Sequence, residues 1–97
     1  MKARFISASN RDIRQILEYY LNEAGAELAA DFCDELEAVI DRIKRSPNAY
    51  PLIDDERRRI LFERFPFQII YRVESSESVK ILAVRHHKQH QDFGLDR

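Results

Sequence analysis

Two apolar stripes with helical spacing occupy the first half of the chain. The first stripe places apolar residues at steps of three and four: Ile13, Ile16, Leu17, Tyr20, Leu21 and Ala24. This spacing predicts a helix that ends near Ala24, where Gly25 supplies a left-handed position. Ser9 stands three residues before Asp12, a relative of the capping box, so we expect the helix to begin there. A second stripe over residues 28–43 stops at Pro47, and the short interval predicts an antiparallel helical hairpin.

The period changes to alternation in the second half. Residues 48–56 follow no period and read as a loop, whereas residues 57–63 and 67–73 alternate apolar and polar positions on either side of Pro66. Residues 79–84 are β-branched and aliphatic, and residues 2–8 are short enough for one strand at the amino end. The expected order is therefore strand, helix, helix, strand, strand, strand.

This order predicts a single α+β domain over residues 1–97, in which a helical hairpin packs on one face of an antiparallel sheet. Residues 67, 69, 71 and 73 form the uninterrupted apolar side of a central strand, so we expect them to face the helices. Tyr71 would then be a core residue with a satisfied hydroxyl. Ile70 and Arg72 would point to the other face. Apolar groups on a face that no helix covers suggest that a partner docks there.

Composition narrows the class of protein. The 97 residues are 44% hydrophobic and 34% charged, which is typical of a folded domain with a charged surface. No apolar run approaches the roughly 18 residues of a membrane span, and no signal-peptide pattern follows Met1, so we expect a cytoplasmic protein without a membrane partner. Cys33 is the single cysteine and cannot form an internal disulfide; we expect it to be a small buried hydrophobe.

Charge is distributed unevenly along the chain. Residues 1–56 carry seven Lys and Arg against twelve Asp and Glu, whereas residues 57–97 carry nine against five. The basic half would suit a polyanion or an acidic protein, although a mixed surface without a partner fits equally well. Residues 57–59 are three consecutive arginines, which either track phosphates or neutralise the acidic residues 54–56.

Two segments of the basic half carry a family resemblance. Residues 59–73 combine an arginine-led strand, a Phe-Pro-Phe corner and an alternating Ile/Tyr strand, and residues 79–88 end in a His-led basic segment. With this pattern the chain resembles, over almost its whole length, the RelE/ParE superfamily of toxins from type II toxin–antitoxin systems. The matching positions are Arg59, Arg64, Phe65, Pro66, Phe67, Ile69, Tyr71, Ile81, Val84, His86 and Lys88. The family pattern often ends in an aromatic pair followed by an arginine. This chain has one aromatic residue of the pair, Phe93, and the closing arginine, Arg97.

The resemblance implies two alternative activities. RelE-like toxins cut messenger RNA on the ribosome, and ParE-like toxins inhibit DNA gyrase by binding. RNA cleavage through the 2′-hydroxyl needs a base, an acid and cations that hold the phosphate. Gln68, His87 and Phe93 stand where RelE-like toxins have arginine, arginine and tyrosine, which leaves two of the three roles empty. This departure favours the ParE-like, plasmid-stabilisation group; an endonuclease, or a family member that has lost toxicity, stays open.

The candidate site residues follow from these alternatives. As a nuclease, the chain would use His86, His87 and Lys88, because histidine titrates near neutral pH, with Arg64 or Arg85 holding the phosphate. Neighbouring histidines on a strand point to opposite faces, so we expect no metal site, and nothing in the sequence implies a cofactor.

As a binding toxin, the chain would contact DNA gyrase and a cognate antitoxin. We expect an acidic, amphipathic antitoxin segment that folds along the toxin as a helix in a groove or as an added strand. The residues expected to bind the target or the antitoxin are Arg59, Arg64, Ile70, Arg72, Arg85, Phe93 and Arg97.

Overall fold

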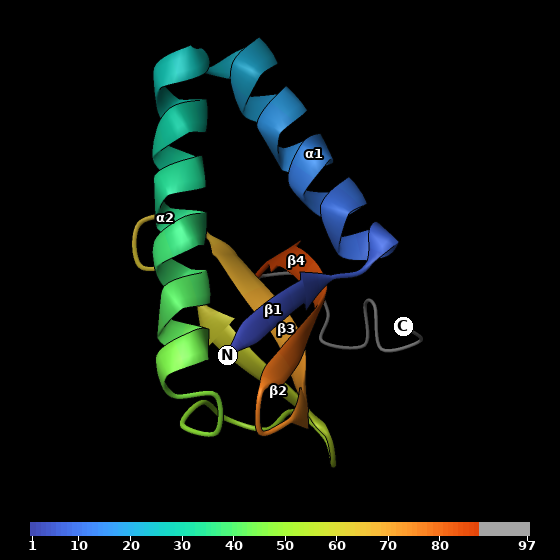
Figure 1. Cartoon of the computed structure of the whole chain (residues 1–97). Helices are drawn as coiled ribbons and strands as arrows, with labels where there is room; N and C mark the ends of the chain where they lie inside the picture. Colours follow the sequence, from blue (N-terminus) through green and yellow to red (C-terminus); the bar gives the residue numbers. More distant parts are fainter. Residues whose placement is uncertain (88–97) are drawn as a thin grey trace.

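The computed structural model describes residues 1–87, which form two helices and four strands (Figure 1). In chain order these are β1 (Lys2–Phe5), α1 (Ser7–Glu23), α2 (Ala26–Arg45), β2 (Arg57–Leu61), β3 (Phe67–Ser75) and β4 (Ser78–His86). The expected element order and the α+β class are confirmed. Among residues 1–87, no helix is both long and apolar enough to cross a bilayer.

The four strands form one sheet in the order β1-β4-β3-β2. Strands β2, β3 and β4 are an antiparallel meander, as the alternating segments predict. Strand β1 joins the sheet beside β4 and runs parallel to it, with Lys2 opposite Ser78 and Phe5 opposite Ile81. The sheet is therefore mixed and not antiparallel throughout as expected, because the two helices carry the chain away from β1 before the meander begins.

Helix α1 begins earlier than the capping pattern suggested. Ser9 lies inside the helix, and its hydroxyl donates to the carbonyl oxygen of Ile6 at 2.8 Å instead of capping the first turn. The carboxylate of Asp12 does not complete a capping box either, since it accepts a hydrogen bond from the backbone N–H of Val84 in β4. The interpretation of Ser9 and Asp12 as a cap was wrong.

The helices meet at Gly25 and splay apart toward the sheet (Figure 1). Gly25 has φ of +104°, a conformation that other residues rarely adopt, and its N–H donates to the Tyr20 carbonyl oxygen at 2.8 Å. The two helices are covered to different extents. Helix α2 buries Ala29, Phe32, Val39, Ile40 and Ile43, whereas the only fully buried residues of α1 are Ser9 and Asp12. The apolar stripe of α1 is thus only partly covered.

The main core lies between the helices and one face of the sheet. Phe67, Ile69 and Tyr71 are buried there against Phe32 of α2, and Val73 packs at its border, which confirms the expected face of β3. The Tyr71 hydroxyl donates to the Pro47 carbonyl oxygen at 2.6 Å, and burial raises the pKa of Tyr71 to about 12. Tyr71 is a structural residue, as its position in the pattern predicts.

The second face of the sheet differs from the expected bare surface. Ile70 points to this face, but it is only 3% exposed, because it packs with Leu82 and Ala83 under Ile6 and Ile53. The chain thus covers the centre of this face with the residue before α1 and the loop before β2. The expectation that Ile70 is an exposed docking residue was wrong.

Cys33 also departs from expectation. It lies on the exposed side of α2 as a free thiol. The stripe on α2 that reaches the core runs through Phe32 and Val39, so the neighbouring helical position of Cys33 turns to solvent.

Candidate functional site

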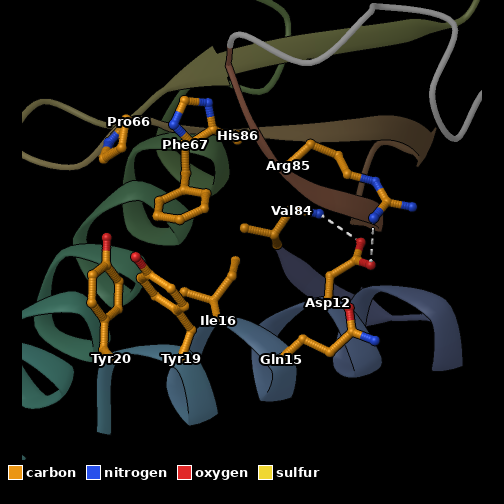
Figure 2. A pocket seen from close by; sticks show the side chains of 10 residues that line it. All are labelled: Asp12, Gln15, Ile16, Tyr19, Tyr20, Pro66, Phe67, Val84, Arg85 and His86. Atoms are coloured by element: carbon orange, nitrogen blue, oxygen red, sulfur yellow. Dashed lines mark hydrogen bonds and ion pairs between the residues drawn. The ribbon is translucent and has the colours of Figure 1, made fainter. Parts of the chain in front are cut away.

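A cleft of about 470 Å³ opens where the partly covered stripe of α1 faces the ends of β3 and β4. Figure 2 shows the side chains around it, with residues of α1 on one side and residues of β3, of β4 and of the loop before β3 on the other. The lining residues are Asp12, Gln15, Ile16, Tyr19, Tyr20, Pro66, Phe67, Val84, Arg85 and His86. Its size is in the range of pockets that receive a small molecule or a few side chains of a partner.

One end of the cleft is aromatic. The Phe67 ring lies 5.7 Å from the His86 ring, with an interplanar angle of 74°, and Tyr20 contacts Phe67 edge-on with ring centroids 6.3 Å apart. Tyr19 is 62% exposed at the mouth of the cleft. Burial, and then the neighbouring Tyr19, raises the pKa of Tyr20. This end can therefore receive an apolar or aromatic group and leave a phenol hydroxyl at the rim.

The other end of the cleft is a buried ion pair. Asp12 is 4% exposed, and its carboxylate lies 3.0 Å from the Arg85 guanidinium and 3.1 Å from the backbone nitrogen of Val84 (Figure 2). Strand β1 pairs with β4 only as far as Ile81. Asp12 therefore accepts a backbone N–H of β4 at a point where β1 no longer pairs with this strand. The same carboxylate neutralises the charge of Arg85. Arg85 therefore has a structural role, because its charge is paired within the fold.

The second face of the sheet carries a ladder of alternating charges. Glu74 lies 3.0 Å from Lys80 and 3.1 Å from Arg72, and Glu56 lies 3.9 Å from Arg72. Hydrogen bonds from Lys80 and then from Arg72 lower the pKa of Glu74. Arg72 is thus engaged by the chain's own acids, which leaves less of its charge for a partner.

The three consecutive arginines of residues 57–59 differ in their contacts. Arg57 lies 3.4 Å from Asp54, and Arg58 donates to the carbonyl oxygens of Asn48 at 3.1 Å and Tyr50 at 2.7 Å. These two arginines hold the preceding loop against β2. Arg59, opposite Ile70 on the second face, forms no ion pair within the part of the chain that the structure describes.

Arg64 lies in the loop between β2 and β3, and Glu35 of α2 holds the backbone of this loop. The Glu35 carboxylate accepts the backbone N–H of Glu63 at 2.6 Å and that of Arg64 at 3.0 Å. The Arg64 side chain is 65% exposed and lies 3.5 Å from Asp31. This guanidinium therefore stands at the surface on a fixed backbone.

The two described histidines lie close together at the end of β4. His86 belongs to the strand, whereas His87 follows it in a turn, and their ring centroids are 5.4 Å apart. The expectation that the two rings point to opposite faces was wrong, since His87 is beyond the strand. Within residues 1–87, no three His, Cys, Asp or Glu side chains are grouped as metal ligands would be. Lys88, Phe93 and Arg97 lie outside the described residues.

Sequence reasoning missed the roles of Asp12 and Glu35. Asp12 holds an element 72 positions away, and Glu35 holds one 28 positions away. One signal pointed to Asp12: it lies four residues before Ile16, at the border of the apolar stripe of α1. A similar signal marks Glu35, which lies three residues after Phe32 and four before Val39, at the border of the apolar stripe of α2.

Residues 4–91 match the family model described as "ParE toxin of type II toxin-antitoxin system, parDE". The chain belongs to the ParE toxin family. It is also 31% identical over 75 residues to "Toxin ParE2" from two strains of Mycobacterium tuberculosis, a match that covers 77% of this chain and 70% of the relative.

A solved structure supports the same fold. The chain matches a protein from the "Chromosomal ParDE TA system from P. aeruginosa" with a TM-score of 0.69 and 20% identity, over 89% of this chain and 95% of the other. The arrangement of two splayed helices and a four-stranded sheet is thus a ParE fold. Three features of this ParE-family chain bear on its activity: the cleft, the Asp12–Arg85 pair, and the loop between β2 and β3 that Glu35 holds.

Proposed function

We propose that this chain is a binding toxin that inhibits DNA gyrase without cleaving nucleic acid, and that a cognate antitoxin neutralises it. The observation that carries the proposal is the state of the arginines on the sheet. Arg85 is paired with the buried Asp12, and Arg72 is paired with Glu74. A phosphate clamp needs cations whose charge is available to the substrate, and these two arginines are neutralised within the fold, which leaves the exposed Arg64 as the remaining candidate for a clamp.

The proposal also agrees with the positions of Tyr71 and Gln68. The Tyr71 hydroxyl is buried and donates to Pro47, and its pKa of about 12 is far from the pH at which a proton donor is efficient. Gln68 is 2% exposed and carries no charge. The middle of the sheet thus supplies packing and not proton transfer.

The assay is DNA supercoiling with purified gyrase, relaxed plasmid and ATP. We expect supercoiling to be lost as this chain is added, and the double variant His86→Ala/His87→Ala to inhibit equally well. Normal supercoiling at saturating protein would refute gyrase as the target.

The two neighbouring histidines support the endonuclease as the second candidate, because an imidazole can serve as base or acid. Toeprinting on a translating ribosome tests it. Cleavage by the wild type that disappears in the double histidine variant would establish the nuclease.

We further propose that the cleft receives apolar side chains of the antitoxin. Its aromatic end offers Tyr19 and Phe67, and the stripe of α1 that lines it is incompletely covered by the chain itself. Tyr19→Asp should weaken the complex with the antitoxin at least about ten-fold, measured by calorimetric titration. Leu21→Asp is the matched control, because Leu21 is 52% exposed on the same helix and does not line the cleft. Equal affinities of the two variants would contradict a role for the cleft.

A further inference from the structure

The loop between β2 and β3 presents Arg64 at the surface on a rigid support. Two buried aromatic residues of the loop, Phe62 and Phe65, anchor it in the main core. The backbone N–H of Phe62 donates to the Phe67 carbonyl oxygen at 2.9 Å, which closes the base of the hairpin. The tip of the hairpin is held as well, because the Glu35 carboxylate accepts two of its backbone N–H groups. A partner that binds here therefore has to order little of the chain.

A hollow of about 310 Å³ lies beside Arg64 at this hairpin. Leu61, the last residue of β2, is 49% exposed, so the hollow is bordered by a large apolar side chain. The backbone N–H of His87 donates to the Pro66 carbonyl oxygen at 2.9 Å and holds the end of β4 against the loop. The lining residues are Leu61, Phe62, Glu63, Arg64, Phe65, Pro66 and His87. The hollow thus combines an exposed apolar side chain with a cation.

A second hollow, between the loop and α2, is acidic. Its lining residues are Asp31, Asp34, Glu35, Ala38, Arg42, Glu63 and Arg64. Arg64 therefore borders both hollows. The Arg64 guanidinium lies 3.5 Å from the Asp31 carboxylate, and both side chains are exposed to solvent, so this pair contributes little to stability. A carboxylate of a partner can therefore replace Asp31 at small cost.

The surrounding acids decide which anion suits Arg64. A nucleic acid carries a phosphate at every nucleotide, and the phosphates next to the bound one would approach Asp31, Asp34 and the 77% exposed side chain of Glu63. A single carboxylate can approach from the side of Leu61 instead, and an arginine binds a carboxylate through two parallel hydrogen bonds. Arginine is also enriched among the residues that contribute most to protein interfaces. The position of Arg64 thus favours a protein partner over a nucleic acid.

We propose that the hairpin tip, residues 61–66, binds gyrase through a gyrase carboxylate that pairs with Arg64 and an apolar gyrase side chain that packs on Leu61. This assignment rests on the proposed function, because that function supplies gyrase as the target. Pro66 lines both this hollow and the cleft in which we place the antitoxin. An antitoxin in the cleft would therefore adjoin the bound gyrase, which gives the antitoxin a means of displacing it.

The first test measures how strongly variants of the full chain inhibit supercoiling by purified gyrase. Arg64→Ala should raise the concentration for half-inhibition at least about ten-fold. Arg64→Lys keeps the charge but not the two parallel hydrogen bonds, so it should fall between Arg64→Ala and the wild type. Leu61→Asp should also weaken inhibition about ten-fold or more. Circular dichroism checks that each variant is folded.

Two matched variants serve as controls. Arg45→Ala removes an exposed arginine that lines neither hollow, and Leu52→Asp changes a leucine that is 53% exposed away from the hairpin tip. Both should inhibit as strongly as the wild type. Equal inhibition by Arg64→Ala and the wild type would overturn this assignment alone. Normal supercoiling with the wild type would refute gyrase as the target and this assignment with it.

Direct binding distinguishes a gyrase carboxylate from a DNA phosphate as the group that meets Arg64. Gyrase immobilised without DNA should bind the wild type at least about ten-fold more tightly than Arg64→Ala, measured by biolayer interferometry. Binding that appears only when DNA is added would show that Arg64 meets a phosphate, and it would overturn the proposal.

Discussion

Asp12 offers the sharpest test of how the fold is held together. Its carboxylate is buried, accepts the Val84 N–H and pairs with Arg85. Asp12→Ala leaves a buried N–H without an acceptor, which costs about 1–3 kcal/mol. It also leaves Arg85 without its counter-ion, and breaking a buried pair costs about 3–5 kcal/mol in all. Since the Arg85 side chain is 14% exposed and can recover some hydration, we expect a loss near the lower end, about 3 kcal/mol.

The measurement is urea unfolding followed by circular dichroism, with thermal unfolding in parallel. A domain of this size loses about 4–8 °C of Tm per kcal/mol, so Asp12→Ala should lower Tm by more than about 10 °C. Asp12→Asn keeps an oxygen for the Val84 N–H and loses only the charge, so it should fall between the wild type and Asp12→Ala. Asp41→Ala, at an exposed acid of α2, is the control and should change stability by less than about 0.5 kcal/mol.

A double-mutant cycle separates the pair from its surroundings. Asp12→Ala combined with Arg85→Ala should cost less than the sum of the two single changes, because the double variant leaves no unpaired charge. If Asp12→Ala were as stable as Asp41→Ala, or if the two changes were additive, the reasoning that Asp12 fastens α1 to β4 through Arg85 would be refuted.

Three further predictions follow from the contacts. Ile70→Asp places a charge in the second apolar cluster and should destabilise the chain by more than about 3 kcal/mol in urea unfolding; a fully stable variant would contradict its burial. Glu35→Ala should lower the free energy of unfolding by about 1–2 kcal/mol, because it leaves the backbone N–H groups of Glu63 and Arg64 without an acceptor. Glu37→Ala, at an exposed position of the same helix, should be neutral, and equal effects of the two changes would argue against the contact between Glu35 and the loop. The raised pKa of Tyr71 means that the fold favours the neutral phenol. The contribution of Tyr71 to the free energy of unfolding is therefore complete below about pH 10 and is lost as the pH rises toward about 12. Stability curves of wild type and Tyr71→Phe should therefore converge over that interval, and parallel curves would refute this assignment.

Local periodicity was sufficient for the elements and for one face of the sheet. Steps of three and four marked both helices, and alternation marked β3 with Phe67, Ile69 and Tyr71 toward the core, because side-chain direction repeats with the backbone period. The family pattern was also legible, since its motif residues are clustered in the second half. These features depend on neighbours in sequence.

Contacts between distant segments were decided by the tertiary structure alone. The parallel direction of β1 depends on where the helices return the chain, and the burial of Ile70 depends on Ile6 and Ile53 arriving over it. Likewise, the position of Asp12 beside an apolar stripe indicates that it faces the protein, but it does not indicate that the carboxylate accepts a backbone N–H 72 positions away. Periodicity specifies which side of an element is apolar, but only packing determines which polar atoms that side meets.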